Sequence, residues 1–295
     1  MKEENFVSII CYYHNYYDKS KNFIEYISNF VINNFKRYEL IIVCDETNDQ
    51  KRNELTKIVK NITNDIQISI IYLEHYYGKN RALSAAIDLS IGDYIIEFDD
   101  INHIINEDKI LDIYRECLNG NDACILVQKK ISISDKLYYS IIKKFSYAKY
   151  TEYREDGILS VVSRRMLNRI GSLKKQVTNK WFYYKLSGLS CKYIQDESNK
   201  KVSMKFIEKT KERVNTIFVF TSLFIDVFAY ISIFSLIISI SLLLFVGLTD
   251  AILGMILSMI MFGLIYIMKK QSLSLEYLWS DTNYQFSSIE KISKE

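Results

Sequence analysis

The sequence predicts an α/β domain with a mostly parallel sheet, followed by a hairpin of two membrane-spanning helices. Short apolar, β-branched runs alternate with amphipathic segments over residues 6–128, which is typical of a sheet covered by helices on both faces. Residues 227–248 and 251–268 are two long apolar runs without a charged side chain. With 295 residues, of which 25% are charged, the chain has room for one globular domain and an attached segment.

Five strand candidates and four helix candidates alternate in the first part of the chain. The strand candidates span residues 6–13, 38–44, 66–73, 93–98 and 122–128. They are apolar on both faces, as buried parallel strands are. Apolar residues at helical spacing fill the gaps, and pairs that mark the four stripes are Phe23 and Phe30, Leu55 and Val59, Leu83 and Ala86, and Ile110 and Tyr114. Polar side chains at two helix starts are the expected N-caps, Asp49 and Asn106.

The alternation ends near Lys130, and the stretch that follows is where we expect an acceptor site. Residues 135–153 are interpreted as an aromatic amphipathic helix, and residues 158–162 as a sixth strand. Ser163 is then placed to cap a short helix that ends at Gly171.

The last third of the chain predicts attachment to a membrane. Residues 206–226 are amphipathic and basic, and we expect them to lie along the membrane surface after a domain formed by residues 1–205. Residues 227–270 contain both apolar runs, and the two residues between the runs force a tight hairpin. Basic residues flank its outer ends, so the positive-inside rule places the N-terminal domain and the tail, residues 271–295, in the cytoplasm. The alternative is a buried helical pair in a soluble protein, although such helices normally keep a polar face.

Composition excludes several classes of function. The 38 basic and 35 acidic side chains give a net charge of +3, which is too even for a nucleic-acid-binding face. The five cysteines form no C-x-x-C pair, which argues against a disulfide framework and a zinc knuckle. The N-terminus has an acidic head and soon becomes polar, unlike a signal peptide.

Polar side chains follow three of the strand candidates. They are His14 and Asn15 after the first strand, Asp45 to Asp49 after the second, and Asp99 and Asp100 after the fourth. The carboxyl ends of parallel strands meet at the edge where open α/β folds bind ligands. Carboxylates are ligands that divalent cations prefer, so these residues are candidates for a metal site at that edge.

These carboxylates also have plainer interpretations. Asp45 and Asp49 could form a turn and a helix cap, and Asp99 could be a solvated strand end.

Three basic residues and one glycine are candidate phosphate ligands. Gly78 and Lys79 open the third helix, where backbone N–H groups and a cation suit a phosphate, although an ordinary helix start would look the same. Arg164 and Arg165 suit a diphosphate or an acceptor phosphate because guanidinium groups bind phosphate with two hydrogen bonds. The alternative for at least one arginine is the exposed side of a short helix.

These motifs, in this order, resemble the family 2 glycosyltransferases. VSIICYYHN at residues 7–15 is similar to the family's VSIVIPVYNE, and ELIIVCDETND at residues 39–49 is similar to its EIIIVDDGSTD. Residues 76–100 resemble the family segment that runs from NFGK to the DxD motif, and SRRML at residues 163–167 resembles the segment after the acceptor-site acid. The membrane hairpin and LEYL at residues 275–278 resemble the polyprenyl-phosphate glycosyltransferase branch, which includes dolichol-phosphate mannosyltransferases.

The resemblance implies a GT-A fold, a nucleotide-sugar donor of the UDP type, and Mg²⁺ or Mn²⁺. It also implies a polyprenyl phosphate acceptor and an inverting hexosyltransferase that serves cell-surface glycan synthesis from the cytoplasmic face of the cell membrane. The site residues that it implies are Asn15, Asp45, Gly78 and Lys79 for the donor, Asp99 and Asp100 for the metal, Arg164 and Arg165 for phosphate, and Asp99 and Asp156 for catalysis.

The chain departs from the family pattern at several positions, and two of these departures affect the acids of the metal site and the acceptor site. The last acid of the DxD motif falls on Ile101, and the acid before SRR falls on Ile158, with Asp156 two residues away. A phosphate acceptor tolerates the second change, because a phosphate monoester is largely dianionic at neutral pH and needs no general base.

Two further hypotheses follow from these departures. One is a transferase with a glycan or lipid hydroxyl acceptor, and the other is a catalytically degenerate protein that binds a lipid or a partner. The identity of the sugar and the oligomeric state, a homo-oligomer included, stay open.

Overall fold

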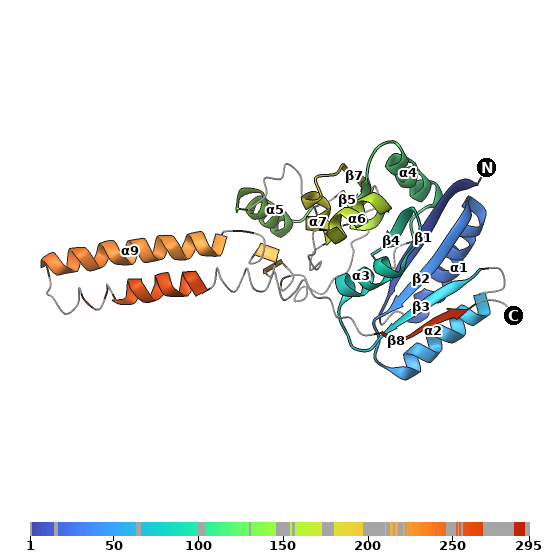
Figure 1. Ribbon diagram of the computed structural model, residues 1–295, viewed down its shortest axis with the longest axis horizontal. Helices are drawn as coiled ribbons and strands as arrows, with labels where there is room; N and C mark the ends of the chain where they lie inside the picture. The colour runs from blue at the N-terminus through green and yellow to red at the C-terminus, as the bar shows by residue number, and fades with distance from the viewer. Residues whose placement is uncertain are drawn as a thin grey trace. The chain divides into compact units, whose positions relative to one another are not determined.

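The structure is a computed structural model (Figure 1). It describes residues 2–14, 17–62, 66–99, 104–129, 131–145, 154, 157–172, 180–196, 210, 213–214, 216–217, 221, 223–245, 252, 254, 256–267 and 286–292. The chain divides into two compact units. Unit 1 comprises Met1–Ile131, Arg154–Ser203 and Thr282–Glu295, and unit 2 comprises Ser132–Tyr153 and Met204–Asp281.

The described strands of unit 1 form one sheet, in the order β7-β5-β6-β4-β1-β2-β3-β8. Four of them are parallel: β1 (Glu3–Tyr13), β2 (Phe35–Cys44), β3 (Ile68–Leu73) and β4 (Tyr94–Phe98). Beyond β4, β6 (Gly157–Ser163) runs antiparallel to both β4 and β5 (Ala123–Gln128), and β7 (Cys191–Asp196) runs parallel to β5. The mostly parallel sheet that the sequence predicts is therefore confirmed.

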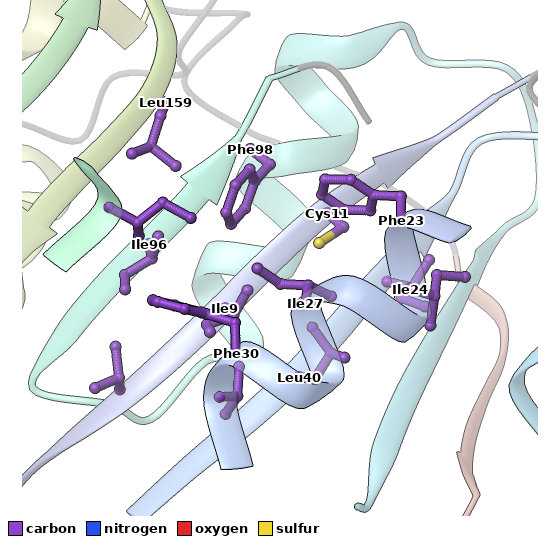
Figure 2. Packing of buried hydrophobic residues seen from close by; sticks show 14 of the residues in the cluster. Ile9, Cys11, Phe23, Ile24, Ile27, Phe30, Leu40, Ile96, Phe98 and Leu159 are labelled. Carbon is purple, nitrogen blue, oxygen red and sulfur yellow. The ribbon is translucent and has the colours of Figure 1, made fainter. Parts of the chain in front are cut away.

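Helices cover both faces of the sheet. The hydrophobic core on one face joins the strands to α1 (Tyr17–Asn34), α2 (Asp49–Ile62) and α4 (Glu107–Leu118). On the other face, the strands pack against α3 (Lys79–Leu89). Figure 2 shows Phe23 of α1 over the sheet beside Phe98 of β4, and their rings meet edge to face with centroids 5.3 Å apart. This packing fixes the end of β4, where Asp99 follows.

The structure confirms the five strands and four helices of the predicted alternation, and one cap differs. Asn48, rather than Asp49, caps α2, because its side-chain oxygen accepts the N–H of Gln50 at 2.9 Å. Ser163 caps α6 (Arg164–Ser172) as expected, and its hydroxyl accepts the N–H of Met166 at 3.1 Å.

Strand β8 (Phe286–Ile292) is an element that the sequence did not indicate. It pairs antiparallel with β3 and forms one edge of the sheet (Figure 1). Residues 286–292, which belong to the tail predicted over residues 271–295, therefore form part of the sheet of the domain predicted to end at residue 205.

Unit 2 contains α5 (Ile133–Phe145), α9 (Leu223–Phe245) and a helical stretch at residues 256–267. Helix α5 confirms the first part of the aromatic helix predicted over residues 135–153, and residues 146–153 lie outside the described residues. Helix α9 begins at Leu223 and carries Asp226 in its first turn, whereas the sequence pattern predicts Asp226 in the preceding surface segment. Within the described residues, no helix combines the length and the hydropathy needed to cross a membrane. The predicted transmembrane hairpin is not confirmed, and its link at residues 249–250 lies outside the described residues.

Candidate functional site

The ends of the parallel strands bring the predicted polar residues to one edge of the sheet. Tyr13 of β1 lies in register with Cys44 of β2, and Cys11 of β1 with Phe98 of β4. The residues that follow these strands, which include Asp45 and Asp99, therefore emerge at the same edge. Asn15 and Asp100, which the sequence also assigns to this edge, lie outside the described residues.

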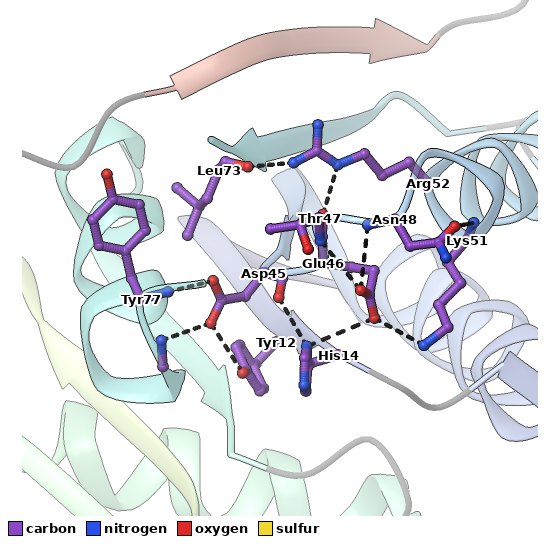
Figure 3. A network of polar contacts seen from close by, with 11 residues as sticks. Tyr12, His14, Asp45, Glu46, Thr47, Asn48, Lys51, Arg52, Leu73 and Tyr77 are labelled. Atoms are coloured by element: carbon purple, nitrogen blue, oxygen red, sulfur yellow. Dashed lines mark hydrogen bonds and ion pairs between the residues drawn. The ribbon is translucent and has the colours of Figure 1, made fainter. Parts of the chain in front are cut away.

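Asp45 holds the loop that leads into α3. Its side chain is buried and accepts the N–H of Tyr77 at 2.9 Å and the N–H of Gly78 at 2.8 Å (Figure 3). The hydroxyl of Tyr12 donates to the same carboxylate at 3.2 Å. Burial raises the pKa of Asp45, although the two backbone hydrogen bonds oppose this shift. Asp45 therefore positions Gly78, which is the N-cap residue of α3 and has φ at +83°. Its predicted contact with a nucleotide stays a prediction.

A second polar cluster lies beside Asp45. His14 Nδ1 is 2.8 Å from the carbonyl oxygen of Asp45 and 3.8 Å from the carboxylate of Glu46 (Figure 3). Burial alone would raise the pKa of Glu46, but hydrogen bonds from Lys51 and from the N–H of Asn48 lower it. The half-exposed ring of Tyr76 lies with its centroid 4.9 Å from that of His14. An aromatic surface is thus present next to the buried Asp45.

Asp99 is buried between two lysines. Lys79, the first residue of α3, places Nζ 2.8 Å from Asp99 Oδ2. Lys180, the first residue of α7 (Lys180–Leu186), donates to Asp99 Oδ1 and to Glu97 Oε1. Lys180 is itself only 4% exposed. The Asp99 cluster, defined as Lys79, Glu97, Asp99 and Lys180, is therefore a buried ionic network at the carboxyl edge of the sheet.

The protonation of the two carboxyl groups in the Asp99 cluster is unequal. Burial would raise the pKa of Asp99, but the ammonium groups of Lys180 and Lys79 outweigh burial and lower it. For Glu97, burial and the nearby Asp99 charge outweigh the attraction of Lys180 and raise the pKa. Asp99 is therefore the more acidic of the two carboxyl groups.

Sequence reasoning missed Lys180. A buried lysine usually has an acidic partner, but its partners here are 81 and 83 residues away along the chain. The only local signal is its place at the start of the aromatic run WFYY.

Packing of Trp181 against β6 positions Lys180. A Cβ atom on Gly157, the first residue of β6, would lie 2.3 Å from Cη2 of the Trp181 ring. Glycine at this position therefore lets the indole rest against the strand. The ammonium of Lys180 in turn lies 4.3 Å from the centroid of the Trp181 ring. Tyr184, one turn later in α7, is also buried.

The described residues of this site do not fit a divalent metal ion. Mg²⁺ and Mn²⁺ prefer several oxygen ligands, whereas no group of three His, Cys, Asp or Glu side chains among the described residues could hold a metal. Each oxygen of Asp99 already accepts from an ammonium group, and a metal ion would have to displace both lysines or face their repulsion. The predicted metal site at Asp99 and Asp100 is not confirmed.

Arg164 and Arg165 lie at the opposite edge of the sheet, which corrects their assignment to phosphate. Strand β6 runs antiparallel to β4, so its last residue, Ser163, is paired with Tyr94 at the start of β4. Arg164 donates to the carbonyl oxygen of Gly92 at 2.9 Å. Arg165 forms two hydrogen bonds with Asp122, of 2.8 and 2.6 Å.

The predicted general base, Asp156, lies outside the described residues. Ile158, which stands where the family pattern has an acid, is buried in β6, and its carbonyl oxygen accepts the N–H of Asp99 at 3.1 Å. The start of β6 therefore lies beside Asp99.

Comparison with known families identifies the domain. The family model described as "Glycosyl transferase family 2" matches residues 8–177, which is more than half of the chain and includes both Asp45 and Asp99. The chain belongs to glycosyl transferase family 2. The predicted family and its GT-A fold are thereby confirmed. No curated protein matches the sequence of this family 2 chain.

Solved structures of the same fold are distant in sequence. One is the mannosyltransferase PcManGT from Pyrobaculum calidifontis in complex with GDP-Man and Mn²⁺, with 13% identity and a TM-score of 0.51; the match covers 74% of this chain and 63% of that one. Another is glucosyl-3-phosphoglycerate synthase from Mycobacterium tuberculosis, with 12% identity, a TM-score of 0.52 and coverage of 72% and 78%. The same enzyme is also known with Mg²⁺ and uridine diphosphate. At these identities, the likeness shows the shared fold.

Proposed function

We propose that this family 2 chain transfers a sugar from a nucleotide-sugar donor, most simply of the UDP type. The observation that carries the proposal is the position of Asp99. In a chain of this family, it ends a buried parallel strand at the ligand-binding edge and is held there by two cations. The structural neighbours crystallised with GDP-Man or UDP-Glc support a donor of this class.

The chemistry requires positive charge at this edge. When the bond between the anomeric carbon and the diphosphate breaks, negative charge develops on the leaving oxygen, and fixed cations stabilise it. The acceptor oxygen attacks the anomeric carbon from the opposite side, and the configuration inverts. The Asp99 cluster supplies fixed cations, and the loop held by Asp45 borders the same edge.

The proposed acceptor is a polyprenyl phosphate on the cytoplasmic face of the cell membrane, and the product would serve cell-surface glycan synthesis. A phosphate dianion attacks without a general base, so this acceptor suits a chain with isoleucine at position 158. If the acceptor were a hydroxyl group, Asp156 would be the base that accepts its proton.

Membrane attachment is proposed for residues 227–268, with the domain and the C-terminal end in the cytoplasm. Helix α9 exposes large apolar side chains to the surroundings, Tyr230, Phe234 and Ile237 among them. A Cβ atom on Gly254 would lie 2.1 Å from the hydroxyl of Ser239, so the two apolar segments approach closely at small residues, as packed membrane helices do. Ser239 satisfies its own hydroxyl by donating to the carbonyl of Ser235 at 2.7 Å.

Strand β8 adds a topological argument. Because β8 pairs with β3, residues 286–292 lie in the same compartment as the sheet. A chain that returns to its own sheet must cross a membrane an even number of times between residues 204 and 281. This argument favours a hairpin with two membrane crossings rather than a single membrane-spanning anchor.

A direct assay tests the transferase. Full-length protein in detergent is incubated with a panel of nucleotide sugars and undecaprenyl phosphate, and a lipid-linked sugar is sought by mass spectrometry. We expect product with one donor and a loss of at least about a hundredfold in Asp99→Asn, because the substitution removes the charge that fixes both lysines. Absence of product with every donor, together with no binding of any nucleotide, would contradict the proposal.

Two further measurements test the acceptor and the topology. Asp156→Asn should leave transfer to undecaprenyl phosphate within about threefold of wild type, whereas a hydroxyl acceptor would require the carboxylate and lose about a hundredfold or more. Alkaline phosphatase fused after Asp250 should be active in intact bacterial cells, and the same reporter fused after Glu295 should be inactive. Activity of the second fusion would refute the hairpin.

A further inference from the structure

We propose that Lys79 and Lys180 supply the positive charge for the diphosphate of the donor, so that donor binding needs no divalent metal ion. The inference rests on the proposed function and concerns the same site. Both oxygens of Asp99 accept from these ammonium groups, one from the start of α3 and one from the start of α7. The place where a metal ion would bind the carboxylate is therefore taken by the chain's own cations.

The two ammonium groups of the cluster favour an anionic ligand. Lys79 and Lys180 come from two different helices and meet at the carboxylate of Asp99, and together they lower the pKa of Asp99. A diphosphate next to Lys79 would be attracted by these ammonium groups, whereas a metal ion at Asp99 would be repelled by them.

The two lysines differ in access to a ligand. The side chain of Lys79 is 21% exposed, whereas that of Lys180 is 5% exposed and also bonds Glu97. Lys79 is therefore the group that contacts the diphosphate. Lys180 acts behind it as a fixed cation that holds Asp99 in place.

Packing makes Lys180 a permanent part of the site. Trp181 lies against Gly157 of β6, and its ring is also close to the Lys180 ammonium. A metal ion that displaced Lys180 from Asp99 would have to move a buried ammonium away from Glu97 as well. Buried contacts, rather than an exposed surface contact, therefore hold the lysine in the site.

Calorimetry of nucleotide binding tests the inference with the full-length protein in detergent. UDP and GDP are titrated separately in EDTA and in MnCl₂. We expect one of them to bind with a dissociation constant that agrees within about twofold between the two conditions. In Lys79→Met, affinity in EDTA should fall by about tenfold or more, because a charge-assisted hydrogen bond to phosphate is lost.

A matched control distinguishes the role of the Asp99 cluster from a general effect of removing one positive charge. Lys192→Met removes a lysine that pairs with Glu116 at 2.7 Å on the surface of β7 and α4. Its nucleotide affinity should equal that of wild type. An equal loss in both lysine variants would overturn the assignment to Lys79.

The remaining outcomes separate the two proposals. Binding that appears only with MnCl₂, or that strengthens about tenfold with it, would overturn the metal-free inference and leave the transferase intact. A rise in melting temperature with MnCl₂ alone would also count against it. If neither nucleotide binds under any condition, the proposed function fails and the inference fails with it.

Discussion

Lys180 at the start of α7 pairs with Asp99 at the end of β4, although 81 residues separate them along the chain. The pair joins the second half of the domain to the edge where the parallel strands end. Because both side chains are buried, the pair should contribute to the stability of the domain as well as to the proposed site.

Removal of Lys180 should destabilise the domain strongly. Among the described residues, Lys180→Met leaves the buried Glu97 and Asp99 with the ammonium of Lys79 as their cation, and the loss of one partner from a buried ionic network typically costs about 3 kcal/mol or more. Urea unfolding of the full-length protein in detergent measures the change. In Lys192→Met, which removes an exposed pair, the urea midpoint should stay close to that of wild type. Equal losses in the two variants would show that the Asp99 cluster contributes no more than a surface contact.

Substitution of Gly157 should displace the indole that supports Lys180. Gly157→Ala would place a Cβ atom 2.3 Å from the Trp181 ring, and overpacking of this kind costs about 1–3 kcal/mol. Tryptophan fluorescence should shift, and the urea midpoint should fall. Gly171→Ala is the matched control, because a Cβ atom added there would meet no neighbouring group within 4 Å; its stability should change by less than about 1 kcal/mol. A urea midpoint equal to that of wild type in Gly157→Ala would contradict the close packing of Trp181 against Gly157.

Arg165 should affect stability in a pH-dependent way and leave nucleotide binding unchanged. Its hydrogen bonds, more than any other cause, lower the pKa of Asp122, so the stabilisation is present above the ordinary carboxyl pKa of about 3.9. It is lost as pH falls through the lowered pKa of the folded state. Arg165→Gln should therefore lower the urea midpoint at pH 7 and have little effect at pH 2.

The same variant tests the location of the two arginines. Because Arg165 follows β6 at the edge away from Asp99, UDP or GDP affinity in Arg165→Gln should match that of wild type. A loss of nucleotide affinity of about tenfold would indicate that Arg165 belongs to the donor site.

Removal of β8 should expose the edge of the sheet. Deletion of residues 286–295 leaves the backbone groups of β3 without their partner strand, and an open edge favours association between chains. Light scattering coupled to size-exclusion chromatography should show larger species than for the full-length protein. Deletion of residues 293–295 alone, which spares β8, should not change the profile. A monodisperse domain without β8 would contradict the role of this strand as an edge cover.

Local sequence patterns predicted the elements of the first half of the domain correctly. The strands before Asp45 and Asp99 were identified because buried parallel strands are apolar on both faces, and Lys79 was placed at a helix start because apolar residues recur at helical spacing after it. The gathering of Asp45 and Asp99 at one edge followed from the rule that carboxyl ends of parallel strands meet.

Predictions that depended on strand direction or distant pairing were less successful. Arg164 follows a strand just as Asp99 does, but β6 is antiparallel to β4, so it emerges at the other edge. Nothing in the local pattern of residues 158–162 specifies that direction. Strand β8 was missed for a similar reason, since its partner β3 lies more than 200 residues earlier.

The sequence by itself determined the family, the alternation of strands and helices, and the carboxyl edge that carries Asp45 and Asp99. Only the tertiary structure decided that Asp99 faces Lys79 and Lys180, and that Arg164 and Arg165 do not join them. The physical reason is the separation along the chain of the residues that interact. Hydrophobic periodicity acts over a few residues and can be recognised locally, whereas an ion pair between α7 and β4 exists only after the sheet has brought the two elements together.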